Sequence, residues 1–162
     1  METKKDKPLK RVKNLVVFSH EHYHGLLFCK RLKKADQTND ETVKRYILDF
    51  CKTYLVSHFN NEEKLFLPLF KEKQNKEIET QFLTEHQQLR TMINELNSTS
   101  VTMHPFAMQF AKLLTNHIRF EERKMFPWIQ ESFSNKKLAP IGNALNNIKI
   151  EAHQFTPQFW EK

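Results

Sequence analysis

Two segments of the chain repeat the same ionisable residues at the same spacing. HFNNEEKLFLP begins at His58 and HIRFEERKMFP begins at His117. In each, two adjacent glutamates follow the histidine by four and five residues, and a proline follows it by ten. A histidine and a glutamate four residues apart share one face of a helix, where both can approach one metal ion. The repeat therefore predicts a metal site that uses His58 with Glu62 and His117 with Glu121.

Four stretches with helical periodicity are long enough to position these side chains. Apolar residues recur every three or four positions along them, which indicates one inward stripe on each. The stretches cover about residues 9–34, 41–73, 76–96 and 106–133. His58 and Glu62 fall on the inward stripe of the second, and His117 and Glu121 on that of the fourth. The third adds His86.

The first stretch offers three histidines as candidate ligands. On a helical wheel, His22 lies on the cleaner apolar stripe. His20 and His24 share a face that also carries Lys13 and Arg31. The wheel favours His22.

Length and composition predict a single all-α domain over residues 1–162. The chain has 14 phenylalanines and only 2 glycines, and long periodic stretches with few turn residues favour helices over a sheet. Four helices joined by short loops predict an up-down-up-down four-helix bundle, with its core at about residues 9–133. Residues 134–162 are expected to form a short helix and a tail. That tail should pack three aromatic side chains on the bundle, Phe155, Phe159 and Trp160.

The inward histidines and glutamates are more numerous than one ion requires. Buried ionisable groups cost several kcal/mol unless they are paired or bind metal, and here every helix carries one. Imidazole with carboxylate suits iron, manganese or zinc rather than magnesium or calcium. Four histidines and two glutamates predict two ions, with Glu62 and Glu121 bridging them.

The formal charge of +7 is concentrated in two basic segments, KKDKPLKRVK and KRLKK. We interpret them as a basic tail and a solvated helix end, because no zinc-finger or aromatic RNA-binding signature accompanies them. Nucleic acid is therefore not the expected partner. No apolar run approaches the ~20 residues of a membrane span, so we expect a cytoplasmic protein that does not enter a membrane.

The two cysteines are too few for a disulfide framework. Cys29 follows His22 by seven residues, and Cys51 precedes His58 by seven. In antiparallel helices both would lie about 10 Å to the same side of the metal layer, since a helix rises ~1.5 Å per residue. We expect two reduced thiols that are near neighbours in the core.

Four segments, taken in order, resemble the hemerythrin-like family, also called the HHE cation-binding family. They are SHEHYHGLLFC, HFNNEEKLFLP, LTEHQQLR and HIRFEERKMFP, within about Leu15 to Ile129. The resemblance implies a four-helix bundle around two iron ions joined by an oxo or hydroxo bridge, with zinc or manganese as alternatives. The ligands it implies are His22, His58, Glu62, His86, His117 and Glu121.

The resemblance leaves the first ligand open. Glu21 and His22 match Glu85 and His86, the family's usual pattern of an acid before the ligand. However, HGLLF after His24 is similar to the continuation after the first ligand in the oxygen carriers. His24 therefore remains the alternative to His22.

Two departures separate the chain from the oxygen carriers in this family. Arg90 stands four residues after His86, where those proteins have a further histidine. In the oxygen carriers an aspartate follows the last histidine by five residues. Here the acid is Glu121, and it follows His117 by four residues. Arg90 either reaches the site as a cation or points to solvent. The pattern is closer to the sensor and repair branches of the family.

The expected function is a non-haem di-iron protein that binds oxygen, nitric oxide or iron for sensing, storage or stress protection. The alternative is a di-iron enzyme, an oxidase or peroxidase or an iron donor in iron–sulfur repair. Because the sequence shows no nucleophile or phosphate loop, binding is favoured over catalysis. Glu63 and Glu122, adjacent to the predicted bridges, point about 100° away on an ideal helix and are expected at the solvent side or behind the ligands.

Overall fold

The computed structural model describes residues 10–161, and every regular element in that range is helical. The expectation of an all-α protein is confirmed. Three 3-10 turns cover Lys13–Leu15, Ala35–Gln37 and Phe159–Glu161. Two π-helical turns, Cys51–Leu55 and Glu121–Met125, join α2 to α3 and α5 to α6. The α-helices are α1 (Val16–Leu32), α2 (Asp40–Phe50), α3 (Val56–Glu72), α4 (Lys76–Ser98), α5 (Met103–Phe120), α6 (Phe126–Ser132) and α7 (Asn135–Leu145).

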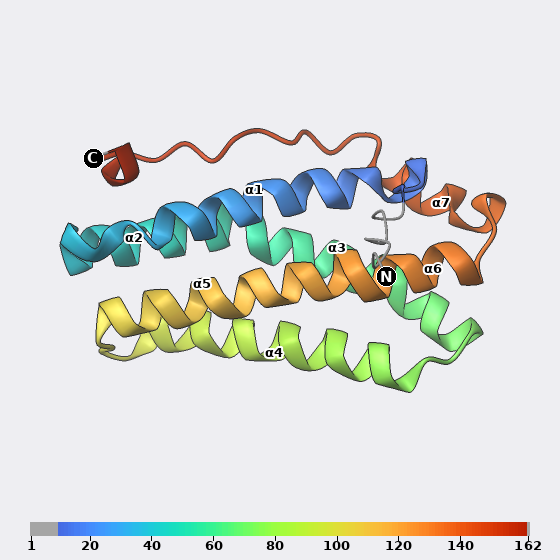
Figure 1. Ribbon diagram of the computed structural model, residues 1–162, viewed down its shortest axis with the longest axis horizontal. Coiled ribbons are helices and arrows are strands. Elements are labelled where there is room, and N and C mark those ends of the chain that lie inside the picture. Colours follow the sequence, from blue (N-terminus) through green and yellow to red (C-terminus); the bar gives the residue numbers. More distant parts are fainter. Residues whose placement is uncertain (1–9, 162) are drawn as a thin grey trace, which may run out of the picture.

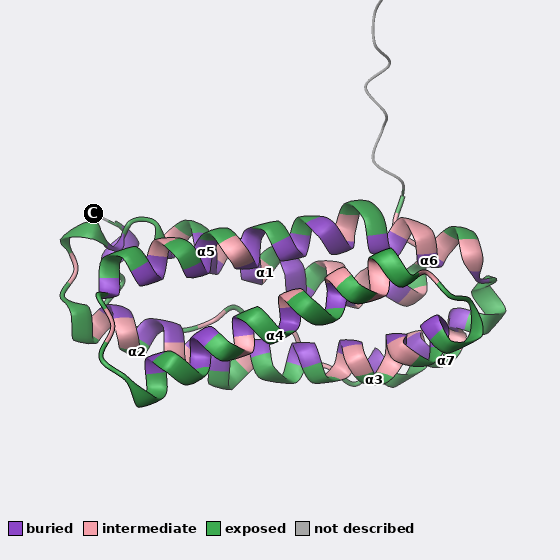
Figure 2. Ribbon diagram, turned by 90° about the horizontal axis from the view of Figure 1, so that it is seen from below, coloured by how far each residue is buried: buried purple, intermediate pink, exposed green. Residues whose placement is uncertain are grey.

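The long helices lie side by side along the long axis of the molecule (Figure 1). α2 continues into α3, and α5 continues into α6, so each pair forms one long rod. α1 lies against α5 in both views (Figures 1 and 2). This packing is consistent with a helical bundle, and the up-down-up-down order of its helices remains a prediction.

Several predicted helix limits are corrected by the structure. Residues 10–12 are not helical, and the predicted start at residue 9 lies outside the described residues. The predicted helices 41–73 and 106–133 are each divided by a π-helical turn. Such a turn widens the helix by one residue and shifts the inward stripe that follows. The sequence has no glycine or proline inside either turn to signal it.

Polar side chains cap the starts of three helices. Asn39 accepts a hydrogen bond from the backbone N–H of Thr42 at the start of α2, at 2.9 Å. Asn75 and Ser134 do the same for α4 and α7. Each cap satisfies an N–H that the helix itself leaves without a partner, typically worth ~1 kcal/mol.

The core has two apolar clusters with a polar layer between them. On α4, Phe82 belongs to one cluster and Leu89 to the other, and His86 separates them. His22 and Glu62 occupy corresponding positions on α1 and α3. Burial of large aromatic side chains on both sides fixes the helices that carry the layer, at ~25 cal/mol per Å² of apolar surface.

The C-terminal segment packs on one of these clusters, as predicted. Phe159 and Trp160 are buried, and Phe155 is partly buried against the same cluster. Cys29 and Cys51 are free, buried thiols in that cluster too. Burial, together with the nearby Cys29, raises the pKa of the Cys51 thiol, which is consistent with neighbouring thiols.

Candidate metal centre

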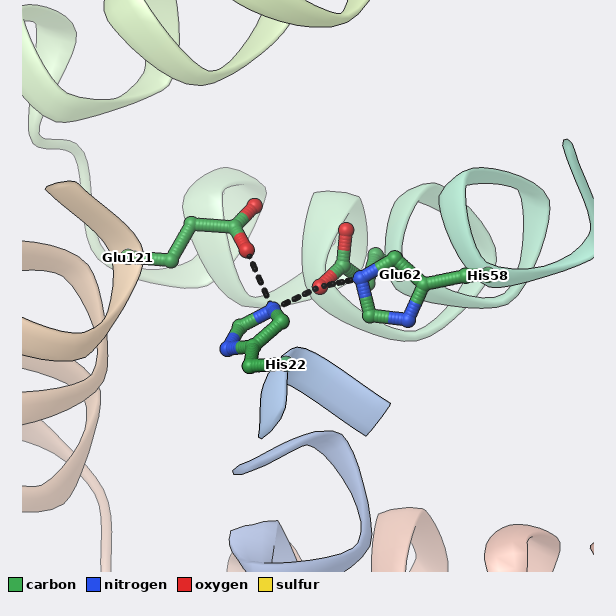
Figure 3. Close-up of side chains that lie close together, drawn as sticks. All are labelled: His22, His58, Glu62 and Glu121. Atoms are coloured by element: carbon green, nitrogen blue, oxygen red, sulfur yellow. Dashed lines mark hydrogen bonds and ion pairs between the residues drawn. The ribbon is translucent and has the colours of Figure 1, made fainter. Parts of the chain in front are cut away.

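The six predicted ligands lie together in the polar layer, and none is more than 4% exposed. They form two overlapping groups of four, and within each group the candidate ligand atoms lie within 4.8 Å of one another. Figure 3 shows the first group converging from three parts of the chain. The first group is His22, His58, Glu62 and Glu121, and the second is Glu62, His86, His117 and Glu121.

Each histidine directs its Nε2 atom towards the shared glutamates. His22 Nε2 lies 2.8 Å from Glu121 Oε2, and His58 Nε2 lies 2.9 Å from Glu62 Oε1. In the second group, His86 Nε2 lies 3.2 Å from Glu62 Oε2, and His117 Nε2 lies 2.9 Å from Glu121 Oε1. Two carboxylates thus stand between two pairs of imidazoles.

Several of these inward atoms have no hydrogen-bond partner despite the short separations. They include Glu62 Oε2, both carboxylate oxygens of Glu121, and Nε2 of His86 and His117. A buried polar atom without a partner costs about 1–3 kcal/mol, and more when it is charged. Buried oxygen and nitrogen atoms that converge while several of them lack a hydrogen-bond partner fit ligands for a cation.

The outer ring nitrogens face a second set of glutamates, which we call the outer glutamates. His22 Nδ1 lies 2.6 Å from Glu122 Oε1, and His86 Nδ1 lies 2.7 Å from Glu63 Oε1. The other two contacts are longer: 3.2 Å from His58 Nδ1 to its partner and 3.5 Å from His117 Nδ1 to its partner. The outer glutamates are Glu21, Glu63, Glu85 and Glu122, and they face His58, His86, His117 and His22 respectively.

Every outer glutamate reaches a histidine on the neighbouring helix rather than on its own. Glu21 of α1 faces α3, and Glu63 of α3 faces α4. Glu85 of α4 faces α5, and Glu122, just beyond α5, faces α1. The contacts therefore form a closed ring around the bundle. A carboxylate at Nδ1 holds the proton on that atom and leaves Nε2 free to bind a metal.

Of the two positions expected for Glu63 and Glu122, the structure shows the one behind the histidines. The sequence missed which histidine each outer glutamate would reach, because that depends on how neighbouring helices are rotated. The one feature of the sequence that pointed to such glutamates was an acid directly before a histidine, at Glu21–His22 and at Glu85–His86. In the structure each of these acids supports a different histidine.

The charges of the cluster shift the pKa of its members strongly. Burial alone would lower the pKa of a histidine, but Glu62 and Glu21 raise that of His58 to about 9. Glu121 and Glu62 likewise outweigh burial and raise the pKa of His86 to about 9. Burial and Glu121 would raise the pKa of Glu62, yet His58 and His22 hold it near 2. In the metal-free protein these histidines therefore hold protons that an ion must displace.

The structure places His22, rather than the alternative His24, in the cluster. His24 is partly exposed and lies beside the Tyr54 ring, with 6.2 Å between the ring centres. Burial and the nearby His20 and Arg31 lower its pKa. His20 itself is exposed.

Arg90 adopts neither of the two predicted positions. Its guanidinium donates hydrogen bonds to Glu63 and Asn60, and it lies over the Phe59 ring. It reaches the cluster only through Glu63, which is bonded to His86. The position that a further histidine ligand would fill is therefore taken by a side chain that supports the cluster through Glu63.

Arg11 plays the matching part on the other side, and sequence reasoning missed it. It donates to Glu122 Oε2 at 2.8 Å, and Glu122 in turn faces His22. Arg11 also donates to Gln130, which anchors the segment before α1. No periodicity connects Arg11 with residues more than 100 positions away.

A small cavity lies beside the first group of ligands. Its walls include Gly25, Leu55, Phe59, Leu114 and Ile118, and its volume of about 10 Å³ is close to what one water molecule requires. Apolar walls on that side exclude bulk water from His22 and His58.

Four buried histidines and two buried glutamates at the centre of a helical protein fit a cation-binding site. Residues 14–129 match the model of the family described as the hemerythrin HHE cation binding domain. The chain belongs to this family. Comparison with curated proteins gave no match, and neither did comparison with solved structures. Within residues 10–161, no helix has the length and apolar character needed to cross a membrane.

Proposed function

We propose that the chain binds two iron ions in this cluster and uses them to bind a small diatomic molecule, oxygen or nitric oxide. The observation that carries the proposal is the pair of overlapping four-residue groups that share Glu62 and Glu121. His22 and His58 would hold one ion, and His86 and His117 the other. A mixed imidazole and carboxylate set suits iron, and the two shared carboxylates suit a pair of ions rather than one.

The cluster also supplies the conditions for a reactive rather than a purely structural site. A non-haem di-iron pair supplies a redox-active centre that binds small diatomic molecules. Each half of the cluster offers two imidazoles and a share of two carboxylates, and Arg90 adds no further ligand. A site with fewer protein ligands than the metal accepts keeps a position for an external molecule. Sensing, storage or stress protection are the roles compatible with such binding.

The outer glutamates prepare the ligands before any ion arrives. Hydrogen bonds to Glu122, Glu21 and Glu63 fix the orientation and the proton position of three imidazoles, so their Nε2 atoms face the centre. Glu85 lies 3.5 Å from the fourth, on His117. The surrounding aromatic rings limit how far the imidazoles can turn. Phe59 stacks on His86 with 4.1 Å between ring centres, and Phe126 stacks on His22 at 5.5 Å.

Metal analysis of protein purified in air, combined with its optical spectrum, tests the proposal. We expect two iron ions per chain and near-ultraviolet absorption from a ferric pair, and we expect azide or nitric oxide to change that spectrum. A protein that takes up zinc in preference to iron, or whose iron spectrum ignores both small molecules, would show the proposal to be wrong. An Arg90→His variant adds an imidazole one turn from His86 and should weaken the response to azide.

A further inference from the structure

One exposed surface combines an apolar centre with unpaired positive charge. Tyr23 is 63% exposed and Leu26 is 37% exposed, although both are large and both lie on α1 close to His22. Monomeric proteins expose isolated apolar side chains routinely, so these two alone indicate nothing. The basic side chains around Tyr23 and Leu26 distinguish them from isolated exposed apolar residues.

Three close approaches show which edge of α1 faces α5. Ser19 donates to Glu122 at 2.7 Å, just beyond α5. A Cβ atom on Gly25 would lie 2.8 Å from Ile118 of α5, which shows how closely the two helices pack. Thr115 of α5 lies close enough to the Cys29 thiol to affect its pKa. The helices therefore run in opposite directions past one another, and both views show them side by side (Figures 1 and 2).

This register places four basic side chains around the two apolar ones. Ser19, Tyr23, Leu26, Lys30 and Lys33 follow one another at spacings of four and three, so they share one edge of α1. On α5, Lys112 and Arg119 lie three or four residues from Thr115, on the edge that faces α1. Arg119 then falls beside Tyr23 and Leu26, and Lys112 beside Lys30. We call Tyr23, Leu26, Lys30, Lys33, Lys112 and Arg119 the α1–α5 face.

No acidic side chain balances these cations on the two helices. The only acidic residue within α1 and α5 is Glu21, which is buried and faces His58. Among the described residues, Lys30, Lys33, Lys112 and Arg119 are exposed and make no ion pair, whereas Arg11 and Arg90 do. The α1–α5 face is therefore a positive rim around an apolar centre. A second copy of the chain would present the same charge and be repelled.

We propose that the α1–α5 face is the docking site for an acidic electron-transfer protein. An apolar centre containing tyrosine inside a charged rim is the usual composition of a protein interface. A positive rim attracts an acidic partner over a distance and speeds its encounter, which suits a brief and repeated contact. The face lies next to the half of the cluster that contains His22, since Tyr23 is the residue after that histidine. The choice of an electron carrier as partner rests on the proposed iron site.

The alternative partner for a basic surface is nucleic acid, whose binding depends mainly on phosphate contacts. The α1–α5 face offers phosphates little at its centre, because Tyr23 and Leu26 occupy it. Four cations around two apolar side chains match a protein with acidic residues around an apolar spot. Charge and apolarity together therefore favour the protein partner.

The test measures binding of oxidised flavodoxin, a small acidic electron carrier, to zinc-loaded protein at low and high ionic strength. Zinc separates docking from the identity of the native metal. We expect salt-sensitive binding that the double variant Lys30→Glu, Arg119→Glu weakens by about tenfold or more, since reversing rim charges removes the attraction. The matched control, Lys64→Glu with Lys71→Glu, reverses two exposed charges on α3 and should bind within about twofold of the original protein.

A third variant, Leu26→Ser, tests the apolar centre and should weaken binding at both ionic strengths. Metal content measured on every variant confirms that the cluster is intact, so a docking failure is distinguishable from loss of the site. Equal binding by the two double variants, or no salt-sensitive binding of flavodoxin at all, would overturn the proposal. Tighter binding of a short DNA duplex than of flavodoxin to this face would instead identify nucleic acid as the partner.

In the iron-loaded protein, the same variants should alter the rate of reduction by reduced flavodoxin. We expect a fall of about tenfold or more for the double variant on α1 and α5, and no change for the control on α3. Unchanged reduction rates alongside weakened binding would show that the docked protein is not an electron donor, and would overturn that part of the proposal.

Discussion

The two halves of the cluster carry the same kinds of candidate ligand, but different parts of the chain support them. In one half, Arg11 bonds Glu122, which faces His22. In the other, Arg90 bonds Glu63, which faces His86. Arg90 belongs to α4, one turn after the histidine that it supports, whereas Arg11 belongs to the segment before α1. The repeated sequence supplies a histidine and a shared glutamate twice, whereas the arginine behind each half comes from an unrelated part of the chain.

The remaining two histidines have weaker support. His58 faces Glu21 and His117 faces Glu85, at 3.2 and 3.5 Å, and neither glutamate bonds an arginine among the described residues. Each half therefore has one firmly held and one less firmly held imidazole. A change at the shared carboxylates should affect both halves, and a change at an arginine should affect one.

The largest effect is expected from a shared ligand. Glu121→Gln keeps the shape of the side chain but removes the charge that faces three histidines. We expect bound metal to fall from two ions per chain to one or fewer, together with a lower thermal midpoint, because ligation contributes to folding. Metal analysis and thermal unfolding measure both effects. The exposed Glu131→Gln is the control, and a full pair of ions in Glu121→Gln would contradict the shared role.

The next effect concerns one half alone. His22→Ala should remove about one ion per chain, because it leaves the first group with a single histidine. His20→Ala and His24→Ala are matched controls on the same helix and should keep both ions. Metal analysis of the three variants decides among them. Loss of metal in His24→Ala alone would identify His24, rather than His22, as the ligand from α1.

The metal-free protein should show a pH dependence shared by both halves. The pKa values of His58 and His86 are raised from 6.5 to about 9, so their stabilising contribution is complete below about pH 6.5 and is lost towards pH 9. The pKa of Glu62 is lowered from 4.5 to about 2, so its contribution is complete above about pH 4.5 and is lost towards pH 2. Stability should therefore be greatest between about pH 4.5 and 6.5.

Urea unfolding of metal-free and metal-loaded protein measures this dependence. The metal-loaded form should keep its stability up to pH 9, because the ions bind the neutral imidazoles and benefit from their deprotonation. A metal-free protein that is more stable at pH 9 than at pH 6 would contradict the assigned protonation of the cluster.

The smallest effect is expected from the arginines. Loss of a partner behind a metal ligand typically weakens metal affinity about 10–100-fold, and an arginine acts one step further out. Arg11→Met and Arg90→Met should each weaken metal binding by less than about tenfold and leave the number of ions unchanged. Competition with a chelator measures the affinity. A loss of affinity in only one variant would show that the two halves are not equivalently supported.

The sequence predicted which residues lie together, because the spacing of four residues places His58 with Glu62, and His117 with Glu121, wherever those segments are helical. The family match over residues 14–129 bears out the resemblance. The π-helical turns were missed because no glycine or proline signals them. Arg11 was missed because its contact joins residues 111 positions apart, and only the tertiary packing brings them together.

The ring of outer glutamates has a further consequence, which concerns ancestry. It passes from α1 to α3, from α3 to α4, from α4 to α5 and from there back to α1. A rotation of 180° about the bundle axis exchanges the pair α1 and α3 with the pair α4 and α5. The order of contacts around the ring is the same after this rotation. Two identical two-helix chains could therefore close the same ring as a symmetric dimer, each placing one glutamate behind a histidine of the other. Duplication and fusion of such a unit within one gene would yield both repeated segments in a single chain.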